Sequence, residues 1–145
     1  MPAKLSAKLP GRHAELDKSG LRPHLLPMID KPRSFGAFWP YYLMAHRDPR
    51  CRRLHFVGST GASIGLIAAI VLLNPLYALA GLVFAYAMAW TGHFAIEKNR
   101  PATFGNPLWS FIGDIRMYFL WLGGRLGPAL AAAEITVADA ARRGV

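Results

Sequence analysis

The sequence has only one cysteine, Cys51, among its 145 residues. A single cysteine excludes a disulfide framework within one chain, and it also excludes a zinc or iron–sulfur site built from several cysteines. Acidic residues are scarce as well, because 8 Asp and Glu stand against 17 Lys and Arg. The first twenty residues lack the apolar run of a signal peptide, so we expect no cleaved secretory leader.

The excess positive charge lies beside the apolar parts of the chain instead of on a polar domain of its own. The residues concerned are Arg47, Arg50, Arg52, Arg53, Lys98 and Arg100. Basic residues that flank apolar spans are typical of membrane proteins and mark the ends that stay in the cytoplasm. We therefore expect a lipid bilayer as a partner and no nucleic acid.

Two apolar stretches predict an all-α integral membrane protein with a transmembrane helical hairpin. Residues 54–73 carry no charge apart from any on His55, and roughly 20 such residues cross a hydrocarbon core. An Asn-Pro turn signal at 74–75 separates them from the second stretch, residues 76–96. A buried helical pair in a soluble protein is the alternative, but nothing else in the chain could cover two such helices. Small residues that permit close helix approach recur at four-residue spacing, as Gly58 with Ala62 and Gly61 with Gly65.

The chain divides into three parts by composition. Residues 1–33 mix Lys, Arg, Pro, Ser and Gly, and they predict a flexible basic extension. Residues 34–127 hold the apolar stretches and predict a membrane-embedded domain. Residues 128–145 are Ala-rich and predict a tail helix at the surface.

Two further segments of the membrane-embedded domain are expected to be helical. Residues 34–46 are rich in aromatics, and their Trp and Tyr suit an interfacial helix at the headgroup layer. Residues 108–127 form a third apolar helix, which could span the membrane, lie in its interface, or dip in and return. Asp114 and Arg116 interrupt this helix, and we expect them to be a structural polar pair with neighbouring helices.

Three of the five histidines lie at the edges of the apolar stretches. His13 and His24 belong to the basic extension, where we expect them to be solvated. Counted from the turn, His55 lies 19.5 positions before it and His93 lies 18.5 positions after it. Because a helix rises about 1.5 Å per residue, an antiparallel hairpin brings these two histidines to the same depth. His46 precedes an Asp-Pro helix break, so its segment can fold back toward the same place.

Three imidazoles and a carboxylate at one depth form a set of metal ligands. Glu97 lies four residues beyond His93, one helical turn along the same face. It could bind the metal, orient an imidazole, or pair with Arg53, Lys98 or Arg100. Imidazole suits iron, zinc, copper or nickel, and histidine with carboxylate and open positions suits non-haem iron that handles oxygen. Residue types alone do not select the metal.

Residues 35–125 resemble a known membrane family, the one that includes the fungal endoplasmic-reticulum 2-hydroxy fatty acid dioxygenase. The resemblance is carried by FWPYYLMAHRDPRCRRLHFVG and by GHFAIEKNRPATFGNPLWSFIGDIRM. Its most specific elements are the aromatic segment that ends at His46, the Asp-Pro pair before His55, and Gly92-His93 followed by EKNRPA at 97–102.

The resemblance implies an iron(II)-dependent enzyme that uses O2 to cut a 2-hydroxy fatty acid between C1 and C2. The product is an acid one carbon shorter, and in fungi the reaction serves phytosphingosine breakdown. Essential histidines of the family fall on His46, His55 and His93, which we expect to bind the metal. We expect Glu97 to join them in catalysis. The Ala/Gly/Arg-rich composition is that of a bacterial protein, so the expected location is the bacterial inner membrane.

A cationic side chain could bind the carboxylate of the substrate, and three basic residues lie close to the histidines in the sequence. Arg53, Lys98 and Arg100 are the candidates, with Arg the better bidentate partner. A 2-hydroxy acid can also chelate a metal through its carboxylate and hydroxyl while its alkyl chain stays in lipid.

Two other functions are compatible with the same residues. His55 and His93 could be opposed axial ligands of a b-type haem, although His46 and Glu97 would then have no role. A non-catalytic hairpin could instead bind partners or anionic lipid through its basic rim. The sequence leaves the chain length of the substrate and the oligomeric state open.

Overall fold

The structure, a computed structural model, describes residues 34–143. The basic extension over residues 1–33 lies outside the described residues. Within the described range the chain is helical and contains no strand, so the predicted all-α class is confirmed. The helices are α2 (Phe35–Met44), α3 (Pro49–Val71), α4 (Leu76–Thr91), the π-helical turn η2 (Gly92–Glu97), the 3-10 turn η3 (Ala102–Phe104), α5 (Pro107–Leu122) and α6 (Leu126–Arg143).

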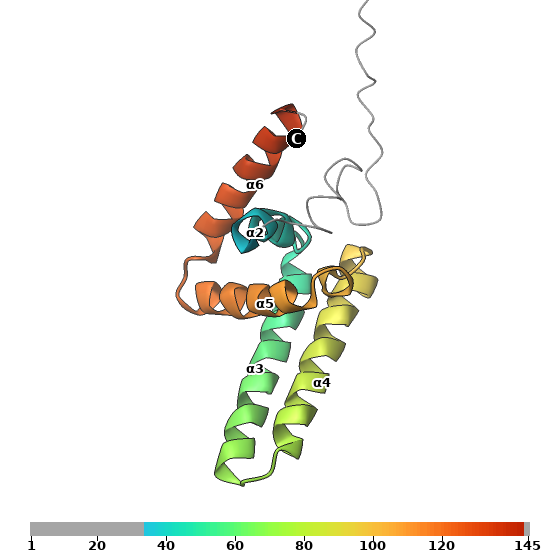
Figure 1. Cartoon of the computed structure of the whole chain (residues 1–145), viewed down its shortest axis with the longest axis vertical. Coiled ribbons are helices and arrows are strands. Elements are labelled where there is room, and N and C mark those ends of the chain that lie inside the picture. The colour runs from blue at the N-terminus through green and yellow to red at the C-terminus, as the bar shows by residue number, and fades with distance from the viewer. Residues whose placement is uncertain (1–33, 144–145) are drawn as a thin grey trace, which may run out of the picture.

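Helices α3 and α4 form a long antiparallel hairpin (Figure 1). Local chemistry sets the start of each leg. The Asp48 carboxylate accepts a hydrogen bond from the Arg50 backbone N–H at 2.7 Å, and Pro49 occupies the first turn of α3, where its missing N–H is harmless. At the start of α4 the Asn74 side chain accepts a hydrogen bond from the Leu76 backbone N–H at 3.0 Å. A polar cap and a short turn therefore define the hairpin.

The two legs approach closely because small residues face each other along their contact. A Cβ atom added to Gly65 would lie 2.5 Å from the Tyr77 carbonyl oxygen. A Cβ added to Gly58 would lie 3.0 Å from the Ala85 Cα atom. Real Cβ atoms do not tolerate the first of these distances, so the spacing of small residues seen in the sequence matches the helix contact.

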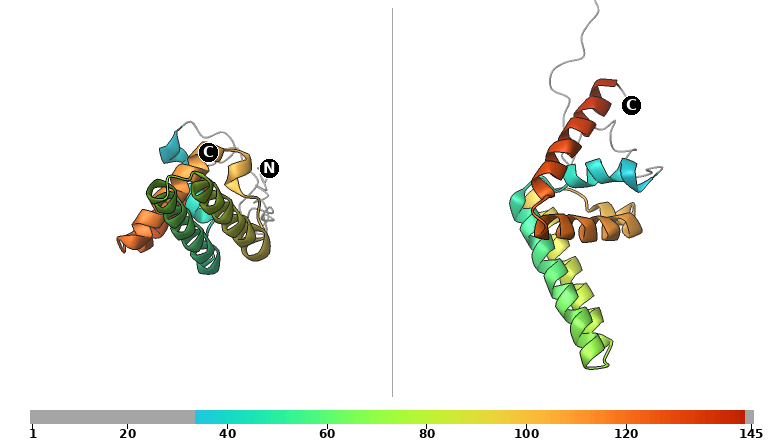
Figure 2. Two further views of the ribbon diagram at one scale, coloured as in Figure 1. Left: turned by 90° about the horizontal axis from the view of Figure 1, so that it is seen from below. Right: turned by 90° about the vertical axis from the view of Figure 1, so that its left-hand side faces the viewer.

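Helices α2, α5 and α6 gather at the open end of the hairpin, and α5 runs across it (Figures 1 and 2). Their shared core is rich in aromatic residues, and its most deeply buried side chains include Phe38, Tyr41, Tyr42, Leu43 and Met117. The aromatics of α2 therefore face protein, where we had expected them to face lipid headgroups. The sequence predicted helices in the regions of α5 and α6, but it did not show that they pack against the aromatic rings of α2.

Two helical stretches are long and apolar enough to cross a membrane, Pro49–Val71 and Leu76–Glu97. Only 22% of the most apolar window of each is buried within the chain. Helix α5 has 16 residues, fewer than the roughly 20 of a typical span, and it lies across the hairpin instead of beside it. This placement excludes a third span parallel to the hairpin in the described fold.

Candidate metal centre

His46, His55 and His93 meet at the open end of the hairpin. They come from the loop after α2, from α3 and from η2, and all three are at least 95% buried. One ligand nitrogen from each lies within 4.8 Å of the other two. The convergence predicted by counting residues from the turn is confirmed, and the ligand role of the three residues stays a prediction.

Each imidazole is held from behind by a hydrogen-bond acceptor at Nδ1. The pairs are His46 with the Tyr42 carbonyl oxygen at 2.6 Å, His55 with Asp114 Oδ1 at 2.7 Å, and His93 with Asn99 Oδ1 at 2.8 Å. A carbonyl and an ionised carboxylate can only accept, so the proton of a neutral ring sits on Nδ1. The lone pair on Nε2 is then free on all three rings, as in many metal-binding histidines.

Two of these Nε2 atoms show that the group is suited to a cation. His46 Nε2 and His55 Nε2 are buried and have no hydrogen-bond partner among the described residues. A buried polar atom left unpaired costs about 1–3 kcal/mol. A metal ion between the rings would satisfy both atoms, and three protein ligands would leave a position open for substrate. The donor set therefore fits a catalytic metal ion.

The electrostatics of His46 favour the form that binds metal. Burial is the main cause that lowers the pKa of His46 well below its ordinary value, and the neighbouring His55 and His93 lower it further. His46 is therefore neutral at physiological pH, and a neutral imidazole is the form that acts as a ligand.

Asp114 of α5 is a functional candidate whose role the sequence did not show. Its Oδ1 atom accepts hydrogen bonds from the Tyr42 hydroxyl at 2.5 Å and from His55 Nδ1 at 2.7 Å. Burial and the Asp114 carboxylate raise the pKa of Tyr42 well above its ordinary value, so its hydroxyl remains a donor. The expected partner Arg116 instead lies over the Trp39 ring, 4.5 Å from its centroid. An ionisable residue inside an apolar stretch was the available signal.

Asn99 orients His93 in a similar way. Its side-chain nitrogen donates to the Ala45 carbonyl oxygen at 2.9 Å, which turns its oxygen toward His93 Nδ1. The π-helical turn and a left-handed residue, Lys98, place Asn99 next to His93. Asn99 lies within the EKNRPA motif, yet sequence reasoning gave it no role.

Glu97 lies beside the start of α3 and not in the histidine group. Its Oε1 atom accepts a hydrogen bond from the Asp48 backbone N–H at 2.6 Å. The first N–H groups of a helix lack partners inside the helix, so they compete for a nearby carboxylate. The Nδ1 atoms of the three histidines are paired with Tyr42, Asp114 and Asn99, and not with Glu97. A catalytic role for Glu97 stays a prediction.

The three basic residues proposed to bind substrate are exposed at the rim. Arg100 lies over the Phe104 ring, 5.6 Å from its centroid. Arg53 and Lys98 are also exposed. Their role stays a prediction. A fourth basic residue, Arg52, donates from Nη1 to the carbonyl oxygens of His46 at 2.8 Å and of Arg47 at 2.7 Å, and so holds the loop that carries His46.

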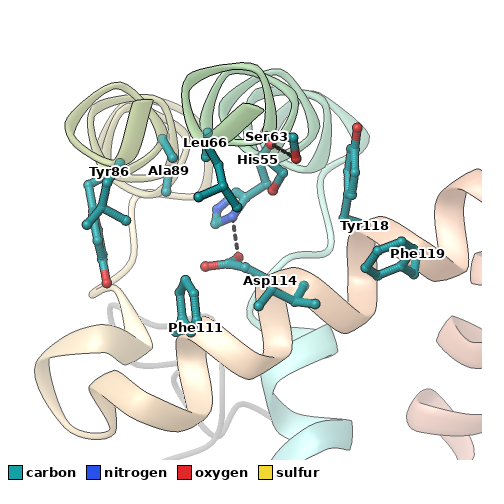
Figure 3. A pocket seen from close by; sticks show the side chains of 14 residues that line it. His55, Ser63, Leu66, Tyr86, Ala89, Phe111, Asp114, Tyr118 and Phe119 are labelled. Atoms are coloured by element: carbon teal, nitrogen blue, oxygen red, sulfur yellow. Dashed lines mark hydrogen bonds and ion pairs between the residues drawn. The ribbon is translucent and has the colours of Figure 1, made fainter. Parts of the chain in front are cut away.

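A cavity of about 220 Å³ lies next to the histidine group, between α3, α4 and α5. Figure 3 shows His55 pointing from α3 toward Asp114 on α5 at the cavity wall, with apolar side chains around them. His55 thus belongs both to the histidine group and to the cavity. A molecule in the cavity would have one end close to the candidate metal position.

The same geometry argues against a haem between His55 and His93. Their ring centroids are 5.2 Å apart, and the His46 centroid is 4.5 Å from each of them. His46 is therefore equidistant from the two rings and lies in the plane that a macrocycle between them would occupy. A haem would have to displace His46 and break its bond to the Tyr42 carbonyl.

Comparison with known protein families assigns the chain to one family. Residues 32–126, well over half of the chain, match the family described as 2-hydroxy-palmitic acid dioxygenase Mpo1-like. No curated protein and no solved structure matches the chain. The matched range contains all three histidines together with Asn99 and Asp114. The chain therefore belongs to the 2-hydroxy-palmitic acid dioxygenase Mpo1-like family.

Proposed function

We infer that this protein is an iron(II)-dependent membrane dioxygenase that shortens 2-hydroxy fatty acids by one carbon. The observation that carries the inference is the buried group of three imidazoles, which offer ligand nitrogens within 4.8 Å of one another and whose Nδ1 atoms are each paired with an acceptor. Membership of a family named for such a dioxygenase supports this reaction class.

His46, His55 and His93 would hold the iron through Nε2. Iron(II) bound there would supply Lewis acidity toward the substrate carboxylate and hydroxyl, and electrons for the use of O2. Asp114 and Asn99 keep two of the rings in the tautomer and orientation that ligation needs. The Tyr42 carbonyl does the same for His46. Burial of all three rings limits the access of water to the site.

The reaction balances when C1 leaves as carbon dioxide. One 2-hydroxy acid and one O2 give the shorter acid, one carbon dioxide and one water. The C1–C2 bond breaks and C2 becomes the new carboxyl carbon. The substrate loses four electrons and O2 gains the same four. The reaction needs no separate reductant, so the protein requires only the acid, O2 and its metal.

We place the hairpin in a lipid bilayer, with the metal centre at its cytoplasmic mouth. Large apolar side chains toward the tip are strongly exposed, for example Val71 at 71% and Leu73 at 90%. A contiguous exposed apolar surface of this kind marks a site of contact with membrane or protein. Arg53, Lys98 and Arg100 lie at the opposite, basic end, where they can attract the carboxylate of an arriving acid. The bacterial inner membrane is the location that we propose.

Metal analysis and an absorption spectrum of the purified protein test the proposal, together with product analysis after incubation with 2-hydroxypalmitic acid and O2. We expect non-haem iron without a Soret band, and pentadecanoic acid as the product. A Soret band would favour the haem-binding alternative. Iron-free protein that yields no shorter acid after iron(II) is supplied anaerobically and O2 is then admitted would favour a non-catalytic hairpin.

A further inference from the structure

The cavity beside the histidine group combines a polar wall with an apolar interior. His55 and Asp114 form the polar wall, and the interior is lined largely by aliphatic and aromatic side chains. Examples from the three helices are Leu66, Ala85 and Phe111. Apolar pockets with a few convergent polar groups are the usual form of small-molecule sites. The chemistry of the lining calls for a ligand that is mostly hydrocarbon with one polar end.

The direction of such a ligand follows from the charges. Among the residues that the structure describes, neither Lys nor Arg lines the cavity, so an anionic head has no cationic partner from them deep inside it. Asp114 already faces the cavity, and its carboxylate would repel a second carboxylate. The basic residues Arg53, Lys98 and Arg100 and the other two histidines, His46 and His93, lie at the open end of the hairpin and are not among the described residues that line the cavity. The acid end therefore belongs toward the histidine group and the hydrocarbon end belongs in the cavity.

The cavity opens among side chains that are themselves exposed on the apolar surface. Leu66 of α3 and Phe119 of α5 line it and are 55% and 64% exposed, respectively. Figure 3 shows α5 crossing the hairpin, with Phe111 and Phe119 on the side that faces α3 and α4. If this surface contacts lipid, a hydrocarbon chain can enter sideways without crossing water.

We propose that this cavity is the binding site for the unbranched alkyl chain of the acid, and that Ser63 on its wall limits the length of chain accepted. This inference rests on the proposed function for the identity of the acid, but the cavity itself does not depend on the metal. Ser63 lies on the cavity wall and is exposed, with its hydroxyl bonded to the Ser59 carbonyl oxygen at 2.9 Å within the same helix. Because Ser63 is part of the cavity lining, a large side chain at this position would take up space that the alkyl chain would otherwise occupy.

The test uses Ser63→Trp, with Ile67→Trp as its matched control. Ile67 is on the same helix one turn on, is 61% exposed, and is not part of the cavity wall. A photoreactive diazirine analogue of 2-hydroxypalmitic acid is applied to the full chain in lipid nanodiscs, and crosslinked peptides are identified by mass spectrometry. The native protein should be labelled on α3 and α5. Labelling by this long analogue should fall about tenfold in Ser63→Trp, which is the loss expected when roughly two methylenes are no longer buried.

Retained labelling by a short analogue, made from 2-hydroxyoctanoic acid, shows that Ser63→Trp is folded. Ile67→Trp should be labelled by both analogues like the native protein. Equal long-chain labelling of Ser63→Trp and native protein, or crosslinks confined to residues outside α3, α4 and α5, would overturn the cavity assignment. The labelling needs neither iron nor turnover, so its result is separate from the test of the dioxygenase. Turnover without cavity labelling would support the proposed function and contradict the binding site. Cavity labelling without turnover would support the binding site and contradict the proposed function.

Discussion

The Asp114 carboxylate on α5 and the His55 imidazole on α3 are joined at 2.7 Å, although 59 residues separate them in the chain. This bond is the link between the helix that crosses the hairpin and the candidate metal centre. The same carboxylate oxygen accepts from the Tyr42 hydroxyl of α2. Three helices are therefore tied together at one oxygen atom, directly behind a proposed ligand.

Replacing Asp114 with Asn should weaken iron binding without unfolding the protein. The amide keeps the size of the side chain but loses the charge that would make His55 a better ligand. Loss of such a carboxylate partner typically lowers metal affinity or activity about 10–100-fold. Competition with a chelator measures the affinity. The matched control is Asp139→Asn, because Asp139 is a partly exposed residue paired with Arg142 on α6 and should leave iron retention unchanged. Equal iron affinity in both variants would contradict the positioning role of Asp114.

His55→Ala and His93→Ala should each remove most of the iron and nearly all activity. A site with three protein ligands loses one third of its donors in either variant, and the remaining two rings also lose a neighbour that fixes their place. Iron content per chain measures the effect after purification from membranes. His24→Ala, which lies outside the described residues, serves as the control and should retain its iron. Iron that survives the loss of both His55 and His93 would show that the three rings do not form the metal site.

Glu97→Gln should keep its iron, because the structure pairs the Glu97 carboxylate with the Asp48 backbone N–H and not with an imidazole. Glutamine retains an oxygen that can accept from the same N–H. Glu97→Ala removes this acceptor and should lower the thermal unfolding temperature more than Glu97→Gln does. Iron content and unfolding temperature in detergent separate the two roles. Loss of iron in Glu97→Gln to the level of His93→Ala would instead identify Glu97 as a ligand.

Gly65→Ala should destabilise the hairpin. The added Cβ would meet the Tyr77 carbonyl oxygen at 2.5 Å, so the helices must separate, and such overpacking typically costs about 1–3 kcal/mol. Thermal unfolding followed by circular dichroism measures the loss. Gly127→Ala is the control, since an added Cβ there has no atom within 4 Å. A Gly65→Ala protein as stable as Gly127→Ala would mean that the two legs do not approach as described.

A reporter that is active only outside the cytoplasm should give no signal when fused after Val145. The expectation follows from basic residues beside both open ends of the hairpin, which keep those ends in the cytoplasm. The same reporter inserted after Asn74 at the tip should be active. Reporter activity at the C-terminus would contradict the proposed topology: together with a silent tip reporter it would mean an inverted hairpin, and together with an active tip reporter it would mean a further crossing.

Helix geometry made much of the candidate site predictable from the sequence. Because the rise per residue in a helix is nearly constant, counting from the turn at Asn74 was enough to bring His55 and His93 to one depth. The Asp-Pro break after His46 was enough to fold that histidine back toward them. The close contact of α3 and α4 followed similarly from small residues at four-residue spacing.

Only the tertiary structure decided what holds the imidazoles. Asp114 reaches His55 because α5 lies across the hairpin, and no local periodicity encodes that crossing angle. It results from the burial of the α2 aromatics, such as Phe38 and Tyr42, against α5 and α6. Asn99 reaches His93 through a π-helical turn and a left-handed residue, which are local conformations that an ideal α-helix does not contain. The depth of His55 and His93 along the hairpin is specified by the local sequence through the helix rise. The partners of the imidazoles depend instead on the packing of distant segments, which the sequence specifies only through the complete fold.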